Sequence, residues 1–162
     1  MFKKYRLILF LLIINLLSAC GFHLQGAFKA PSSMELTYVA TNNQYSAFYR
    51  ELRLQLLSAG VKLSDSPADA TAILNIHSDQ TSQRVLSVSA RNVPTEYEVF
   101  YTINYSLNSG QYELIPRQTL TLTRDYIYNS TLVLGKEREE ELIRDAITKD
   151  LVRVVLKQIS TL

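Results

Sequence analysis

The chain has 162 residues, with 17 Lys and Arg against 15 Asp and Glu and a formal net charge of +2. Three of the basic residues precede an apolar run at the N-terminus, so the rest of the chain is close to neutral and lacks the basic field that attracts nucleic acid. A single cysteine excludes an internal disulfide framework. The low Gly and Pro content argues against disorder, and the length suits one domain.

Residues 1–19 have the three zones of a secretory signal peptide. A positive start is followed by an apolar run over Leu7–Leu17, broken only by Asn15, and by the small pair Ser18-Ala19. The run is shorter than the roughly 20 apolar residues of a spanning helix, which disfavours a transmembrane anchor.

Leu17-Ser18-Ala19-Cys20 resembles a bacterial lipobox. That class carries an S-diacylglyceryl group on the cysteine, is cleaved before it, and is then N-acylated. Each buried CH₂ contributes about 0.8 kcal/mol, so three chains on Cys20 would anchor the protein firmly. The alternative is a stray cysteine beside an ordinary cleavage site. Gly21 stands where Asp would retain such a protein at the inner membrane, so it is compatible with outer-membrane sorting.

Residues 20–33 contain several Gly, Pro and Ser residues and are expected to form a lipidated tether. A single domain is expected over 34–162. Its first strand is predicted at 36–40 and its first helix at 43–59, capped by Asn42 or Asn43. Apolar residues at spacings of three and four predict the buried face of this helix: Tyr45, Phe48, Leu52 and Leu56. Tyr49 and Leu57 widen that face.

A second strand is predicted to begin near Ala72 and to run on through Val88, with a break at 79–82. The clearest period-two pattern covers 97–107 and predicts an antiparallel strand with one wet face. A hairpin turn at Asn108-Ser109-Gly110 leads to a strand that lasts until about Ile127. Pro116 in that strand marks an edge or a bulge.

The last element is predicted as a helix over 136–160, with acidic residues in its first turns and a buried stripe of Ile143, Ile147, Leu151, Val154 and Val155. The order β-α-β-β-β-α predicts an α+β protein. Two helices would cover one face of a mostly antiparallel four-stranded sheet, giving a two-layer α/β sandwich. The other face is polar and must meet water or a polar partner.

Catalytic and metal-binding motifs are missing from the sequence, so no enzyme, catalytic residue or metal site is expected. His23 lies in the tether. His77 is predicted to be an ordinary strand residue, and a hydrolase using it as a base is kept as a remote alternative.

Arg91 and Lys136 are distinguished by their positions. Each is a cation that follows apolar residues at the end of an element. Such a pairing suits a phosphorylated, acylated ligand. The local sequence alone favours the other interpretation, two solvated surface charges.

Several motifs in order resemble the LptE family of LPS-assembly lipoproteins. Cys20-Gly21-Phe22-His23-Leu24 resembles its mature N-terminus, although Gln25 stands where the family usually has Arg. The other matching stretches are Pro31-Ser32-Ser33-Met34, Leu54-Gln55-Leu56 through Gly60-Val61, Arg91-Asn92 with Glu96-Tyr97, and Leu134-Gly135-Lys136-Glu137.

The resemblance implies a non-enzymatic lipoprotein anchored to the outer membrane by the acyl chains on Cys20. It would bind lipopolysaccharide (LPS), with Arg91 and Lys136 as binding residues. It would also form a one-to-one complex with the LPS-transport β-barrel, as plug and assembly factor, in the insertion of LPS into the outer leaflet. The alternative is an auxiliary lipoprotein of another envelope lipid-transport complex. No nucleic-acid partner and no separate cofactor are expected.

Overall fold

The computed structural model describes residues 28–128 and 133–162, and the side chains of residues 133–137 lie outside this description. The predicted leader, the lipid site at Cys20 and most of the tether therefore lie outside the described residues. The elements in chain order are η1 (Ser32–Met34), β1 (Leu36–Thr41), α2 (Ala47–Ser58), β2 (Lys62–Leu63), β3 (Ala72–Val88), β4 (Pro94–Ser109), β5 (Tyr112–Ile127) and α3 (Val133–Ile159).

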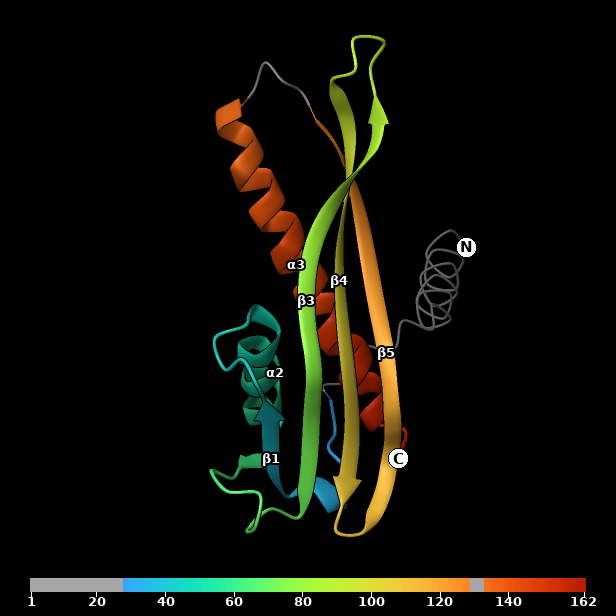
Figure 1. Ribbon diagram of the computed structural model, residues 1–162. Helices are drawn as coiled ribbons and strands as arrows, with labels where there is room; N and C mark the ends of the chain where they lie inside the picture. Colours follow the sequence, from blue (N-terminus) through green and yellow to red (C-terminus); the bar gives the residue numbers. More distant parts are fainter. Residues whose placement is uncertain (1–27, 129–132) are drawn as a thin grey trace, which may run out of the picture.

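The strands form one mixed sheet in the order β2-β1-β3-β4-β5. β1 is parallel to β2 and β3, whereas β3, β4 and β5 are antiparallel neighbours. Helices α2 and α3 lie on one side of the sheet (Figure 1), which confirms the predicted α+β class. The sheet has five strands, whereas four were predicted. The strand missed by the prediction is β2, whose two residues are too few to produce a periodic sequence pattern.

The start of α2 was wrongly predicted. The N-cap is Ser46, whose side chain accepts a hydrogen bond from the backbone N–H of Tyr49 over 3.1 Å. Asn43 instead accepts from the N–H of Tyr45 and closes a local turn, a competing use of Asn side chains. Tyr45 consequently lies before the helix and is 88% exposed, and Leu57 is 51% exposed. The buried face of α2 is narrower than predicted.

The predicted break at 79–82 is also wrong, because β3 is continuous over 17 residues. Successive residues of this strand point to opposite sides of the sheet, so every second polar residue lies on the open face, away from the helices. Gln80 and Ser82 lie opposite Thr102 and Phe100 on the open face. The irregularities occur elsewhere, as register shifts around His77 and Leu86.

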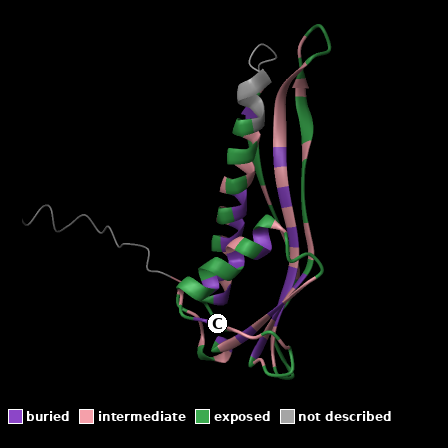
Figure 2. Ribbon diagram, turned by 90° about the vertical axis from the view of Figure 1, so that its left-hand side faces the viewer, coloured by how far each residue is buried: buried purple, intermediate pink, exposed green. Residues whose placement is uncertain are grey.

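The core lies between the helices and the lower half of the sheet (Figure 2). The period-two prediction for β4 is confirmed, because Val99, Tyr101, Ile103, Tyr105 and Leu107 are all at most 3% exposed. The C-terminal half of α3 supplies the opposing layer: Ile147, Leu151, Val152, Val155, Leu156 and Ile159. Fully burying each such side chain contributes about 1.5–3 kcal/mol. Val154, predicted in this stripe, is only partly buried.

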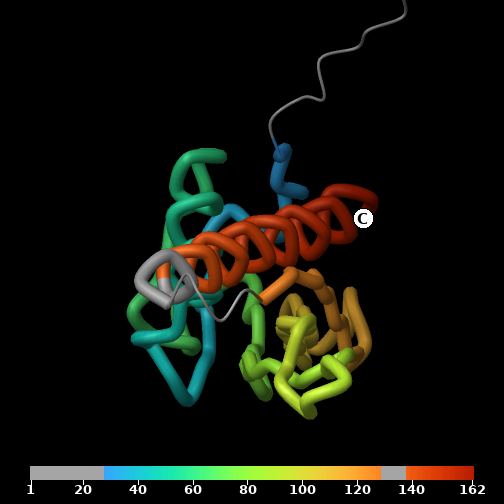
Figure 3. Tube along the Cα trace, turned by 90° about the horizontal axis from the view of Figure 1, so that it is seen from above, coloured from blue at the N-terminus to red at the C-terminus, as the bar shows by residue number. Residues whose placement is uncertain are grey.

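Helix α3 begins at Val133, three residues before the predicted start, so Glu139–Glu141 lie beyond its first turn. Lys157 lies in the last turn, where its charge complements the helix dipole. Viewed from above (Figure 3), the coloured part of α3 runs across one side of the strands. No helix in the described part of the chain is long and apolar enough to cross a membrane.

The open face of β3, β4 and β5 is a polar ladder, as the sequence predicted. Hydroxyl and amide groups pair across neighbouring strands: Thr102 with Thr121 over 2.8 Å and Asn104 with Thr119 over 2.8 Å. Pro116 meets both parts of its prediction, because β5 is an edge strand and its register shifts at this point. The long hairpins carry this face well beyond β1 and α2 (Figure 1).

Candidate functional site

Arg91 lies in the turn that joins β3 to β4, at the far tip of the sheet (Figure 1). The turn is closed by backbone hydrogen bonds from Ser89 to Val93 and from Asn92 to Ser89, of 2.8 and 2.9 Å. Asn92 has a φ of 59°, a left-handed conformation that Asn tolerates better than most residues. The side chain of Arg91 is exposed, and no described residue forms an ion pair with it. The turn therefore presents a free cation to solvent.

Exposed apolar side chains lie on the end of β3 that leads into this turn and in the turn itself. Val85, Leu86, Val88 and Val93 are between 41% and 53% exposed. Two register shifts, at Leu86 on β3 and at Thr95 on β4, twist the end of the hairpin and remove the strict alternation of faces. Apolar groups consequently reach solvent from the end of β3 and from the turn, and the tip combines a positive charge with an exposed apolar surface.

Lys136 lies in the first turn of α3, where the helix follows the connection from β5. Its side chain lies outside the described residues. The beginning of α3 and the β3–β4 turn lie at the same end of the molecule (Figures 1 and 2). The fold thus brings the neighbourhoods of the two predicted binding residues to one end, although 45 positions separate them in the sequence.

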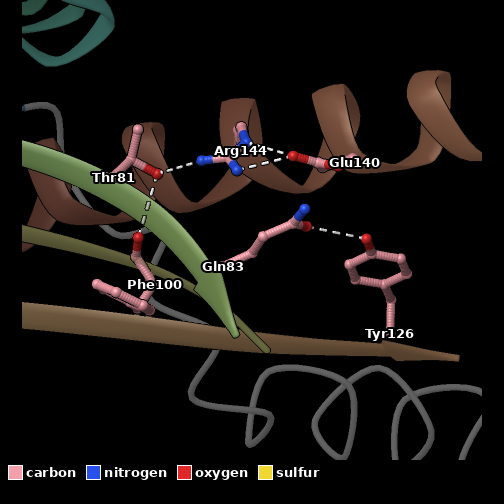
Figure 4. Close-up of polar contacts among 6 residues, drawn as sticks. All are labelled: Thr81, Gln83, Phe100, Tyr126, Glu140 and Arg144. Atoms are coloured by element: carbon pink, nitrogen blue, oxygen red, sulfur yellow. Dashed lines mark hydrogen bonds and ion pairs between the residues drawn. The ribbon is translucent and has the colours of Figure 1, made fainter. Parts of the chain in front are cut away.

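A polar seam joins α3 to the sheet just below this end (Figure 4). Arg144 donates to Glu140 Oε1 over 2.7 and 2.9 Å, and its Nη1 donates to Thr81 Oγ1 over 2.6 Å. Thr81 Oγ1 in turn donates to the backbone oxygen of Phe100 over 3.1 Å. One guanidinium therefore connects α3, β3 and β4.

A group of tyrosines extends the seam along β4 and β5. The rings of Tyr97 and Tyr126 stack with centroids 5.6 Å apart, and the ring of Tyr128 meets Tyr97 edge-on. Tyr126 donates to Gln83 Oε1 over 3.1 Å. Burial raises the pKa of Tyr126, and the negative charge of Glu140 raises it further. This hydroxyl remains a neutral donor near pH 7.

A second polar contact, below Thr81, joins the sheet to α2. The hydroxyl of Tyr101 donates to Asp79 Oδ1 over 2.5 Å and accepts from the backbone N–H of Phe48 in the first turn of α2. Burial raises the pKa of Tyr101, and its hydrogen bond to Asp79 raises it further. The pair connects β3 and β4 to α2.

His77 lies in β3, as predicted, at a register shift of the sheet. Its Nε2 lies 2.9 Å from Oγ of Ser106, which is 5% exposed. Among the described residues no group of three or more His, Cys, Asp or Glu side chains could hold a metal ion. The structure thus gives His77 a hydrogen bond to a buried serine.

Sequence reasoning did not single out Arg84 or Arg144. Arg84 lies near the tip on the open face, where it pairs with Glu98 over 2.6 Å and lies 6.0 Å from the ring centre of Phe100. Nothing in its local sequence separates it from other exposed arginines. The sequence does not reveal the role of Arg144 either, because its partner Thr81 is 63 positions away.

Solved structures show the same fold in a class of bacterial lipoproteins. The rare lipoprotein B of Shewanella oneidensis matches with a TM-score of 0.69 at 21% identity, covering 78% of this chain and 94% of that one. Lipoprotein B of Nitrosomonas europaea matches with a TM-score of 0.71 at 26% identity, covering 86% and 90%. The fold is therefore one that occurs in small bacterial lipoproteins with an α+β body.

Sequence comparison narrows the class to one family. The profile described as "LptE: Lipopolysaccharide-assembly" matches residues 35–159, most of the chain. The LPS-assembly lipoproteins LptE of Yersinia pestis (strain Pestoides F) and Yersinia pseudotuberculosis (serotype O:1b) are each 22% identical over 161 residues, covering 98% of this chain and 77% of theirs. The chain belongs to the LptE family of LPS-assembly lipoproteins.

Proposed function

We propose that this protein is an outer-membrane lipoprotein that binds LPS at its distal tip and acts as plug and assembly factor for the LPS-transport β-barrel. In this role it assists the insertion of LPS into the outer leaflet. Its place in LPS assembly follows from its family. The ligand site and the barrel partner are the parts proposed here.

The observation that carries the LPS site is the chemistry of the tip. LPS combines phosphate groups with acyl chains, so a binding surface needs both a cation and apolar area. Arg91 supplies a free guanidinium, and the valines and leucine around it supply exposed apolar surface. Lys136 would add a second cation from the first turn of α3 at the same end.

The plug role is supported by the open face of the sheet. A soluble two-layer protein exposes such a face to water, and a water-filled lumen lined with polar groups offers the same surroundings. The Thr and Asn pairs of this face are uncharged and mutually hydrogen bonded. These hydroxyl and amide pairs can lie against a polar wall with their hydrogen bonds satisfied, and Arg84 and Glu98 on the same face are paired with each other.

The proposed anchor is the acylated Cys20, followed by the short segment that enters the domain. Phe28 and Ala30 already pack against the core, so fewer than ten residues separate the anchor from the folded body. An extended segment of that length spans at most roughly 30 Å. The domain would remain close to the inner surface of the outer membrane.

The LPS site can be tested by charge reversal in the full chain. Arg91→Glu and Lys136→Glu, singly and together, should weaken the binding of purified LPS, with the double variant at least tenfold weaker because two attractive contacts become repulsive. Lys62→Glu, on β2 far from the tip, is the matched control and should bind like the wild type. Normal binding by the folded double variant would remove the site.

The barrel partner is tested by purification from detergent-solubilised outer membranes. A tagged full-length chain should bring down a large β-barrel protein at one-to-one stoichiometry, identified by mass spectrometry. Recovery of an inner-membrane transporter instead would favour an auxiliary lipoprotein of another complex. Mass spectrometry of the N-terminal peptide would test acylation at Cys20 separately.

A further inference from the structure

Strand β1 has an outer edge that β2 covers only in part. β2 pairs with β1 at Leu36 and Thr37 and then ends, and in the described part of the chain no other strand continues along this side. The opposite side of β1 pairs with β3 from Thr37 to Thr41. The last residues of β1 therefore form a short open edge, which lies beside α2 (Figure 1).

The backbone groups of Val39 and Thr41 point out from this open edge. The carbonyl of Thr37 faces β2, since it accepts from the backbone N–H of Ser64 over 2.9 Å. Backbone groups along a strand alternate between its two neighbours, so those of Val39 and Thr41 point to the same side as those of Thr37. Because β2 does not reach them, an extended peptide could pair with them as an additional strand.

A cavity of about 150 Å³ lies beside the open edge. Its lining comes from β1, from α2 and from the segment around the end of β2, and includes Tyr38, Val39, Tyr49, Arg53, Leu63 and Asp65. Because Val39 belongs to this lining, a strand paired with the open edge would run alongside the cavity. One of its side chains could then reach Arg53.

Arg53 gives the cavity a cation. Its guanidinium carbon lies 5.7 Å from the ring centre of Tyr49, a side chain that is itself only 8% exposed. Arg53 is exposed, and none of the ion pairs among the described residues includes it. A guanidinium placed over an aromatic ring and left without an anion suits a carboxylate ligand. Asp65 in the same lining would repel a second negative charge, so one carboxylate fits better than a phosphate.

We infer that the open edge of β1 and the cavity beside it form a docking groove for an extended peptide segment of a partner protein. The segment adds a short strand to β1 and places a carboxylate against Arg53. Main-chain hydrogen bonds to Val39 and Thr41 supply affinity that is independent of sequence, whereas the cavity and its guanidinium select an acidic group. The open edge is short, so the groove holds a few residues and not a long strand.

The inference goes beyond the proposed function and does not rest on it. The groove lies beside β1 and α2, whereas the proposed LPS site lies at the β3–β4 tip, at the far end of the long hairpin (Figure 1). A peptide and LPS can therefore be titrated separately into the same protein.

The test uses the full chain in detergent, with amide hydrogen exchange followed by NMR, and three peptide probes. The first probe is the capped pentapeptide acetyl-Thr-Val-Glu-Val-Thr-amide. The second has Gln in place of its Glu, and the third is the second with a free C-terminal carboxylate. The first probe should slow the exchange of the Val39 and Thr41 amides. The amides of Tyr38 and Ala40 face β3 and serve as the internal control, so their exchange should not change.

The carboxylate is tested by comparing the probes and one variant. The first probe should bind roughly tenfold more tightly than the second, and Arg53→Gln should remove this difference without changing the affinity for the second probe. Arg50→Gln, an exposed position on the same helix outside the cavity lining, is the matched control and should bind like the wild type. If the third probe binds as tightly as the first, the carboxylate of a chain end also satisfies Arg53.

Two results would overturn the inference. One is unchanged exchange at Val39 and Thr41 with all three probes at millimolar concentration. The other is equal affinity of wild type and Arg53→Gln for the first probe. Thermal unfolding of Arg53→Gln shows that the variant is folded, so a loss of peptide binding by that variant reports on the groove.

Discussion

Arg144 Nη1 donates to Thr81 Oγ1 over 2.6 Å and joins the N-terminal half of α3 to β3 (Figure 4). The described part of this half contains no fully buried residue before Ile147, whereas the C-terminal half contributes six residues to the core. The two halves of α3 are thus held by different interactions, the first mainly polar and the second apolar.

Replacing Arg144 with Ala should therefore loosen only part of the helix. We expect hydrogen exchange to speed up over residues 138–146 and to change little over 147–159. The free energy of unfolding should fall by about 1 kcal/mol, since the guanidinium is partly exposed and its bonds are weakened by solvent. Arg138→Ala removes only an exposed pair with Glu141 and should leave exchange unchanged. Uniform exchange along α3 in Arg144→Ala would contradict the two-part description.

Removing the hydroxyl of Tyr101 should lower the free energy of unfolding, although only one oxygen atom is lost. Tyr101→Phe leaves Asp79 without its hydrogen-bond donor, and the second oxygen of that carboxylate is already buried without one. Leaving a buried acceptor without a donor destabilises a protein by about 2 kcal/mol or more. The free energy of unfolding of Tyr101→Phe in urea measures this loss. The control Tyr45→Phe changes a side chain that is 88% exposed and should have little effect. Equal stabilities for the two variants would show that the Asp79 contact contributes nothing.

The turn that carries Arg91 depends on the backbone at Asn92. Its φ of 59° is strained for a β-branched side chain, so Asn92→Val should lower stability by about 1–2 kcal/mol, whereas Asn92→Gly should be close to neutral. Thermal unfolding of both variants compares the two effects. Equal stabilities of the two variants would mean that the turn adopts another conformation.

Asp150 makes the free energy of unfolding depend on pH in the acidic range. Its hydrogen bond from Arg124 holds the pKa of this carboxyl below its ordinary value, against an opposing effect of burial and with help from Arg153. A lowered pKa in the folded state gives stability that is present above the unfolded pKa of about 3.9 and is lost as the pH falls through the folded pKa.

Asp150→Asn should accordingly lose about 0.5 kcal/mol at pH 7, a small value because the carboxylate is partly exposed. The loss should disappear below the folded pKa of the wild type. Urea unfolding at several pH values measures this difference. A deficit that stays constant down to low pH would assign the effect to packing rather than to charge.

The fold class could be predicted because its main signals are periodic. The alternation over 97–107 and the helical spacing around Ile147 and Leu151 both reflect burial on one face, and both faces are buried in the structure. The errors occurred where polar residues have several uses. Asn43 can cap a helix or close a turn, and the sequence does not decide between these roles. Asp79 and Gln80 suggested a break, but a long strand places them on opposite faces.

The candidate site could be predicted only in part. The position of Arg91 at the end of a strand could be predicted because the strand pattern before it and the loop signal after it are local, whereas its role stays a prediction. The seam could not be found from local patterns, since Arg144, Thr81 and Tyr126 come from distant parts of the chain and meet only in the folded protein. The position of the β3–β4 turn at the same end of the molecule as the beginning of α3 likewise depends on the length of the hairpin.

The most direct test of the central claim is photocrosslinking to LPS in outer membranes. A photoreactive amino acid replaces Ala90, beside Arg91 in the exposed turn, in the full-length chain. The same group at Tyr112, which is 78% exposed at the opposite end of the sheet, serves as the control. We predict an LPS adduct at position 90 and none at position 112. No adduct at position 90, or equal adducts at both positions, would contradict the assignment of the tip as the LPS site.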